Sequence, residues 1–282
     1  MGRLFKAFLF KLTRDLTFRI TLIIGAGFAL LIAGMLILID SMAAADGGAT
    51  TKFLTGENML ALSLTPGQTY SLAIPINVAI FICLEFTQGS IRNKIIAGNS
   101  KFSIYLSLFL SGLLFCFALM TTYVLICFAL GCIFGGFNPN GAYLLGYNFT
   151  PEYFVKLIVA SILVYTSIVS FTVFIATTFR NIGPCIPIVI VVLLILTTFA
   201  PLVTQLMSAS LGEDGDGLVW FMRIVNPLHV VGESTMVINA ETREVTLAIT
   251  NETFIAGICS NIFYSALFFG FGALEFKKRD VK

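Results

Sequence analysis

Apolar residues fill six long stretches of this sequence, and shorter polar segments separate them. A membrane-spanning helix needs roughly 20 mainly apolar residues to cross a hydrocarbon core about 30 Å thick. A helix satisfies its own backbone hydrogen bonds, which lipid cannot do, so each stretch predicts a transmembrane helix. The predicted helices cover residues 20–39, 70–86, 102–134, 153–179, 184–207 and 253–274. The sequence therefore predicts an all-α membrane protein in which residues 1–282 form a single domain.

Local sequence features modify this simple picture. Residues 102–134 are more than a crossing requires, so we expect this helix to tilt or to end in an outer segment. Pro75 and Asn77 weaken the second stretch. Gly131-x-x-x-Gly135 is a spacing that lets helices approach closely. Residues 41–69 are rich in Gly, Ala and Thr, which predicts a loosely ordered segment.

Two further segments are expected to lie along or in the membrane surface. Residues 1–19 place apolar side chains at helical spacing beside basic ones, which predicts an amphipathic helix along the inner leaflet. Residues 208–252 form a long outer segment between the fifth and sixth stretches. Its part 218–225 is too apolar for a free loop, and Pro227 interrupts it. We therefore expect a re-entrant helix there, dipping into the outer leaflet.

Lys and Arg set the orientation, because cytoplasmic loops of membrane proteins carry an excess of them. With six crossings, both termini share one side, and placing them inside puts 13 of the 17 basic residues there. The 13 are Arg3, Lys6, Lys11, Arg14, Arg19, Arg92, Lys94, Lys101, Arg180, Lys277, Lys278, Arg279 and Lys282. Both termini and the segment between the second and third helices are therefore predicted to be cytoplasmic.

Composition excludes several function classes. Only 11% of the residues are charged, against about 25% in a soluble protein, and the net charge is a mild +2, so nothing indicates nucleic acid. A single histidine, His229, rules out a multi-histidine metal site, and no P-loop sequence is present. The six cysteines lie in or beside apolar stretches, which favours small apolar side chains over a metal site or disulfides. We expect no enzyme activity, metal or cofactor in this chain.

The segment LEFTQGSIRNKIIAGNSK, residues 84–101, interrupts the apolar sequence with charge. Gly89 and Gly98 are plausible ends of a short helix between them. Ile91, Ile95 and Ile96 can share one face of that helix, with basic and amide side chains on the others. Such a helix suits insertion into a groove on another protein. A solvated inner loop that is basic for topology alone is the alternative.

The pattern from Glu85 to Lys101, E-F-T-Q-G-S-I-R-N-K-I-I-A-G-N-S-K, resembles the signature of the ABC-2 type exporter permeases. These are the membrane subunits of ATP-binding cassette transporters. The amphipathic start, the six helices and the apolar outer segment with Asn226-Pro227 are similar too. The resemblance implies that the chain spans a bacterial cell membrane and pairs with a second permease, identical or related. It also implies that separate ABC ATPase subunits bind MgATP and drive export.

The resemblance further implies where the partner and the substrate would bind. Residues 86–101 would be the coupling helix that sits in the ATPase cleft, with Arg92 and Lys94 contacting the ATPase and Glu85 bracing the helix against residues 1–19. The coupling residues are Glu85, Gly89, Ile91, Arg92, Asn93, Lys94, Ile95 and Gly98. An apolar and aromatic pathway suits an amphiphilic substrate such as a peptide antibiotic or drug, and its candidate residues are Phe28, Asn77, Phe81 and Phe199. The alternative function is an ATPase-independent membrane channel or scaffold.

Overall fold

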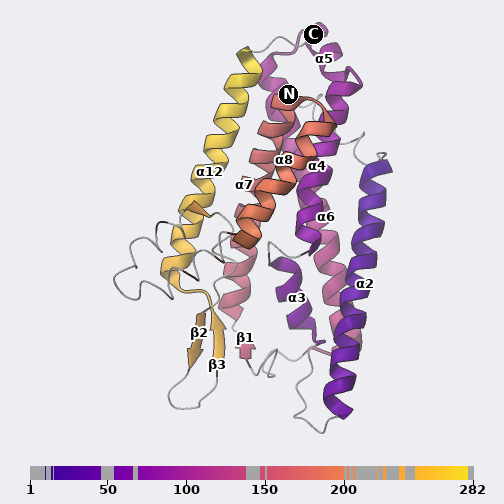
Figure 1. The fold of residues 1–282 in the computed structure, drawn as a ribbon, viewed down its shortest axis with the longest axis vertical. Helices are drawn as coiled ribbons and strands as arrows, with labels where there is room; N and C mark the ends of the chain where they lie inside the picture. The colour runs from indigo at the N-terminus through magenta and orange to yellow at the C-terminus, as the bar shows by residue number, and fades with distance from the viewer. Residues whose placement is uncertain are drawn as a thin grey trace.

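The structure is a computed structural model, and it describes residues 10, 14, 16–45, 54–65, 69–137, 147–149, 151–199, 202, 206, 221, 225–226, 235–238 and 245–278. Within these residues the protein is an elongated bundle of helices with a small sheet at one end (Figure 1). The helices are α2 (Leu16–Ala45), α3 (Gly56–Leu64), α4 (Thr69–Thr87), α5 (Ser90–Ile96), α6 (Lys101–Gly135), α7 (Pro151–Phe179), α8 (Ile182–Leu194), the π-helix η2 (Ile195–Phe199) and α12 (Asn251–Lys278).

Four of these helices, α2, α6, α7 and α12, are long and apolar enough to cross a membrane. The number is five if the bent pair α4 and α5 counts as one span. The apolar helix formed by α8 and η2, Ile182–Thr198, is shorter. The chain is therefore a multi-pass membrane protein, as its sequence predicts. The predicted amphipathic helix at 1–19 and the predicted re-entrant helix at 218–225 lie almost wholly outside the described residues.

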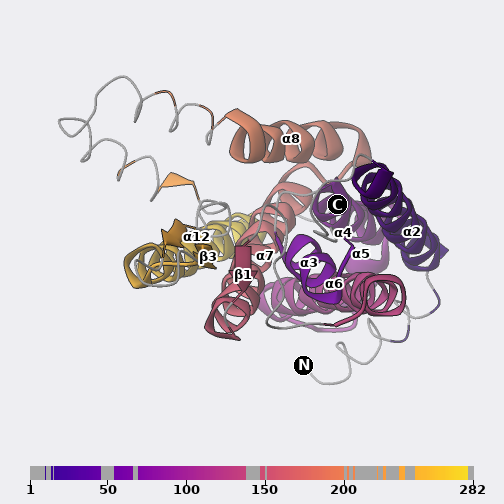
Figure 2. The same cartoon turned by 90° about the horizontal axis from the view of Figure 1, so that it is seen from below.

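Helix α7 lies in the middle of the bundle, between α12 on one side and α4 and α6 on the other, whereas α2 lies at the far edge (Figure 2). In an apolar 18-residue window of each helix, 61% of the α7 residues are buried, against 17% in both α2 and α12. Helix α7 packs against α4, α6, α8 and α12. The exposed large apolar side chains of α2 and α12 are what a helix surface in contact with lipid requires.

Helix α3 contradicts the prediction that residues 41–69 are loosely ordered. Thr55 caps this helix, its hydroxyl accepting a hydrogen bond from the Asn58 backbone N–H at 3.3 Å. Asp40, near the end of α2, accepts a hydrogen bond from the Leu54 backbone N–H at 3.0 Å. Most of α3 is buried against α6. Gly56 allows this close packing, because a Cβ there would lie 2.6 Å from Cys132 Sγ of α6, while residues 46–53 of the predicted loose segment lie outside the described residues.

The pair Gly131 and Gly135 in α6 makes this packing possible. A Cβ at Gly131 would lie 2.7 Å from the Thr55 carbonyl oxygen, and one at Gly135 would collide with the Leu54 carbonyl group. The 35 residues of α6 exceed a crossing, and its last turns receive the segment that begins α3. The predicted close approach of a helix at these glycines is confirmed, and α3 is the element that approaches.

A three-stranded sheet, which the sequence analysis did not anticipate, lies at the end of the bundle opposite α5 (Figure 1). Its strands are β1 (Tyr147–Phe149), β2 (Thr235–Ile238) and β3 (Val245–Ala248). Strand β3 is central, antiparallel to β2 and parallel to β1. The strands are rich in β-branched and aromatic residues, which fit a pleated surface.

Hydrogen bonds between side chains join helices inside the bundle. The Thr21 hydroxyl donates to Asn77 Oδ1 at 2.8 Å and links α2 to α4. The Ser167 hydroxyl donates to Asn261 Oδ1 at 2.8 Å and links α7 to α12. Polar pairs of this kind hold helices together where lipid offers no alternative partner.

Candidate functional site

Helices α4 and α5 form a sharp elbow at the end of the bundle opposite the sheet. Their axes are bent by 56° across a two-residue break. Gly89 at the N-cap of α5 has φ +67°, and Gly98 beyond its end has φ +82°. Both lie in the left-handed region that glycine adopts without steric cost. The helix ends that these glycines predict are confirmed.

An ion pair closes the inside of the elbow. Lys94 Nζ of α5 lies 2.6 Å from Glu85 Oε2 of α4. The Glu85 side chain is 1% exposed and that of Lys94 is 19% exposed. A carboxylate buried without a partner would destabilise the fold. The ammonium group of Lys94 compensates the charge of the Glu85 carboxylate. The sequence analysis assigned Lys94 to the ATPase and Glu85 to bracing against residues 1–19, but the structure pairs these two side chains with each other.

The remaining residues of α5 divide between an inner and an outer face. Ile91 is 1% exposed and belongs to the core, and Ile95 packs against that core. Arg92 and Asn93 are exposed, and Ile96 is 74% exposed. The three isoleucines therefore do not share one face. The surface that α5 offers to a partner combines a cation, an amide and one large apolar side chain.

Three of the four predicted pathway residues, Phe28, Asn77 and Phe81, have described side chains, and these pack within the bundle. Phe81 is 1% exposed and stacks on Phe115 with ring centroids 5.5 Å apart, so it fills the core. Asn77 bonds to Thr21, and Phe28 packs against the core. Phe199 ends η2, and its side chain lies outside the described residues. A half-buried position in an apolar helix cannot by itself distinguish pathway from packing.

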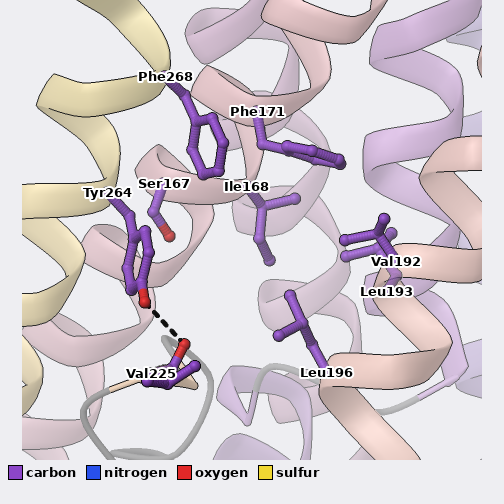
Figure 3. A pocket seen from close by; sticks show the side chains of 9 residues that line it. All are labelled: Ser167, Ile168, Phe171, Val192, Leu193, Leu196, Val225, Tyr264 and Phe268. Atoms are coloured by element: carbon purple, nitrogen blue, oxygen red, sulfur yellow. Dashed lines mark hydrogen bonds between the residues drawn. The ribbon is translucent and has the colours of Figure 1, made fainter.

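A cavity of about 260 Å³ lies between α7, α8 and α12 (Figure 3). In Figure 3, α12 supplies Tyr264 and Phe268 on one side, α8 and η2 supply the other side, and α7 lies between them. The lining is Ser167, Ile168, Phe171, Val192, Leu193, Leu196, Val225, Tyr264 and Phe268. Its aromatic rings pack on one another, with the centroids of Phe171 and Phe268 5.1 Å apart.

Two backbone carbonyl groups beside this cavity accept hydrogen bonds from side chains. The Tyr264 hydroxyl donates a hydrogen bond to the Val225 carbonyl oxygen at 3.0 Å, as Figure 3 shows. The next residue, Asn226, is 4% exposed, and its amide donates to the Leu196 carbonyl oxygen at 3.2 Å. Leu196 belongs to η2, and π-helical turns occur often at functional sites. The Asn226 side chain thus donates a hydrogen bond to a backbone carbonyl of the π-helix η2 beside the cavity.

The chemistry of this cavity suits an apolar group. The Ser167 and Tyr264 hydroxyls already donate to Asn261 and Val225. The rest of the lining is aliphatic or aromatic, as in most small-molecule sites. The sequence analysis missed these residues, although Tyr264 and Phe268 share one face of a helix at the spacing i, i+4.

Basic residues gather at the elbow end of the bundle. The ammonium group of Lys101, at the start of α6, donates to the Lys277 carbonyl oxygen at 3.3 Å, which joins α6 to the last turn of α12.

Among the described residues, no group of three or more His, Cys, Asp or Glu could hold a metal ion. No known family model matches the chain, and no curated protein matches it.

Proposed function

We propose that this chain is the membrane-spanning permease subunit of an ATP-driven exporter of the ABC-2 type. The observation that carries the proposal is the α4–α5 elbow. A buried acid at the end of one span holds a short helix by its lysine, and that helix turns Arg92, Asn93 and Ile96 away from the bundle. A rigid helix with an apolar residue among polar ones fits a groove on a partner protein.

The proposal includes six crossings of a bacterial cell membrane with both termini in the cytoplasm. In this proposal, α4 and the shorter apolar helix formed by α8 and η2 would be the two crossings beyond the four long spans. The proposal also includes a re-entrant outer segment between the fifth and sixth crossings. The hydrogen bond from Tyr264 to Val225 supports it. Tyr264 lies halfway along α12, about 20 Å from the Asn251 end at 1.5 Å per residue. Val225 would therefore lie well inside the membrane.

In the proposed mechanism, two permease chains pair with two ATPase subunits that bind MgATP. A ligand shifts a two-state equilibrium only by its different affinity for the two states. The ATPase must therefore bind one permease conformation better through α5. Because Lys94 and Glu85 fix α5 to α4, movement of α5 would pass directly into the bundle. The exported substrate would be amphiphilic, which the apolar cavity of Figure 3 supports.

A photo-reactive phenylalanine analogue at Ile96 tests the partner contact in host membranes. The expected product is a cross-link to a subunit that mass spectrometry identifies by its P-loop as an ATPase. The same analogue at Phe263, which is 60% exposed on α12, is the control and should give lipid adducts. Cross-linking at position 96 without any nucleotide-binding subunit would instead favour an ATPase-independent channel or scaffold.

Coupling is tested with the isolated complex in vesicles. The double variant Arg92→Ala with Ile96→Ser should insert normally but lower permease-dependent ATP hydrolysis at least about tenfold, since both exposed contacts are lost. The sequence alone suggested Arg92 and Ile95, but Ile95 packs inward and its loss would also disturb folding. Glu252→Ala, at an exposed acid at the opposite end of the bundle, is the control and should leave hydrolysis unchanged.

The orientation is tested separately with a thiol introduced by Asn93→Cys, an exposed position. A membrane-impermeant maleimide should label it in inside-out vesicles and not in intact cells. Glu252→Cys at the opposite end should show the reverse pattern. Labelling of position 93 from outside would overturn the proposed function.

A further inference from the structure

A groove runs between the first turn of α6 and the last two turns of α12, directly after the α5 elbow. Its volume is about 640 Å³, within the range of small-molecule sites. It is lined by Ser100, Lys101, Phe102, Phe269, Gly270, Ala273, Leu274 and Lys277. The two lysines, the serine and Phe102 come from the ends of the helices, and the remaining residues lie deeper along α12.

The cationic part of the groove is held in place by the fold. Lys101 Nζ lies 3.3 Å from the Lys277 carbonyl oxygen, so its ammonium group lies over the end of α12. An ammonium can donate to several acceptors at once. The Ser100 hydroxyl caps α6 by accepting from the Ser103 backbone N–H at 3.2 Å. The positive end of the α6 dipole lies at the same place and favours an anion.

The acids on the neighbouring helices are directed elsewhere. Glu275 of α12 accepts a hydrogen bond from the Thr178 hydroxyl of α7 at 2.7 Å. Glu85 of α4 pairs with Lys94. The rim of the groove therefore carries a net positive charge.

The apolar part of the groove is open to the surroundings of the bundle. Phe102 is 50% exposed and Leu274 is 58% exposed. Gly270 has no heavy atom within 4 Å of the position that a Cβ would occupy, so it leaves space on the α12 wall. In a membrane protein, this wall faces hydrocarbon while the lysines lie at the span ends.

We propose that this groove binds an anionic phospholipid. The phosphate lies between the ammonium groups of Lys101 and Lys277, and one acyl chain lies along Phe102 and Leu274 over Gly270. Basic pockets between transmembrane helices bind anionic head groups in this way. The apolar wall favours a lipid over free phosphate, which would use only the rim. The inference rests on the membrane location of the chain and not on an ATPase partner.

A bound lipid at this place steadies the elbow. The groove begins at Ser100, two residues after Gly98, and the Lys101 side chain joins the start of α6 to the Lys277 backbone carbonyl at the end of α12. One phosphate group between the two lysines reduces the repulsion between their charges. The junction that follows α5 is then fixed to α12 by a non-covalent bridge.

Native mass spectrometry of the full chain, purified from vesicles of equal phosphatidylglycerol and phosphatidylcholine, tests the site. The wild type should retain one phosphatidylglycerol in preference to phosphatidylcholine. Lys101→Gln and Lys277→Gln should each lower that retention at least about fivefold, because each removes one of two cations. Lys278→Gln is the matched control, one residue away and outside the groove lining, and should retain the lipid.

Two further measurements separate the alternatives. Gly270→Leu should block the acyl chain and lower retention, whereas Gly34→Leu on α2, also in open space, should not. Millimolar inorganic phosphate should not displace the lipid, and displacement would assign the rim to free anions and overturn the proposal. Equal retention of both lipids, or equal loss in Lys278→Gln, would also overturn it. Lipid retention without any ATPase contact at Ile96 would refute the proposed function alone.

Discussion

Lys94 of α5 reaches back to Glu85 of α4, and their Nζ and Oε2 atoms lie 2.6 Å apart at the inside of the elbow. Lys94, which the sequence resemblance assigned to the ATPase, is therefore engaged within the chain. It leaves Arg92 as the exposed cation of α5. The direction of α5 is therefore set within the chain, before any partner binds.

Removing Lys94 should destabilise the protein more than removing Arg92. Lys94→Met removes the ion pair of the buried Glu85 carboxylate, which should cost about 3 kcal/mol of unfolding free energy. Arg92→Met changes an exposed cation on the same helix and should cost less than about 0.5 kcal/mol. Unfolding by denaturant in mixed micelles measures both. The double variant Glu85→Leu with Lys94→Met should recover most of the loss, and failure to recover would argue against the pair.

Gly272 should tolerate no side chain, in contrast with Gly270 two residues earlier. A Cβ at Gly272 would collide with the Tyr105 hydroxyl, and Tyr105 is fixed between Phe269 and Phe276. Gly272→Ala should therefore cost about 1–3 kcal/mol of unfolding free energy. Gly270→Ala meets open space and should be neutral or stabilise by up to about 1 kcal/mol. Thermal unfolding of the two variants gives the comparison.

Tyr105→Phe should rescue Gly272→Ala. The Tyr105 hydroxyl is buried and has no hydrogen-bond partner among the described residues. Its removal therefore frees space beside Gly272 and takes away a buried polar atom that has no hydrogen bond. The single variant Tyr105→Phe should then be stabilising by about 1 kcal/mol. A gain in the Gly272→Ala background no larger than the gain from Tyr105→Phe alone would show that the collision does not occur.

Substitution of Gly135 should detach α3 from α6. A Cβ there would collide with the Leu54 carbonyl group, and backbone cannot move aside as a flexible side chain can. Gly135→Ala should raise amide hydrogen exchange across residues 54–65 at least about tenfold, which corresponds to a loss of 1.4 kcal/mol. Gly27→Ala on α2 meets open space and should leave that exchange unchanged. Unaltered exchange in both variants would contradict the packing described.

Replacement of Glu57 should stabilise the protein. Glu57 is 2% exposed, and neither of its carboxylate oxygens has a hydrogen-bond partner among the described residues. Glu57→Met has a similar size and no polar atoms to bury, so we expect a gain of about 1–3 kcal/mol. Glu252→Met, at an exposed acid in the first turn of α12, should lose up to about 1 kcal/mol. If Glu57→Met is destabilising instead, the carboxylate has a partner beyond the described residues.

The sequence by itself determined the membrane class and the positions of the long helices. Stretches of roughly 20 apolar residues must become helices in lipid, whatever packs beside them. It also determined the ends of α5, because Gly89 and Gly98 adopt backbone angles that other residues avoid. These are local properties, and a local pattern is enough to state them.

Tertiary structure alone decided which residues meet. A periodic apolar pattern shows that Phe81 and Tyr264 lie in helices, but not that Phe81 fills the core while Tyr264 lines a cavity. Likewise, the local sequence around Glu57 is typical of a solvated acid in a loop. Glu57 is buried because the segment that contains it packs closely against Gly131 and Gly135 of α6. Contacts between residues far apart in the chain depend on how helices are placed in space, and no single stretch of sequence contains that information.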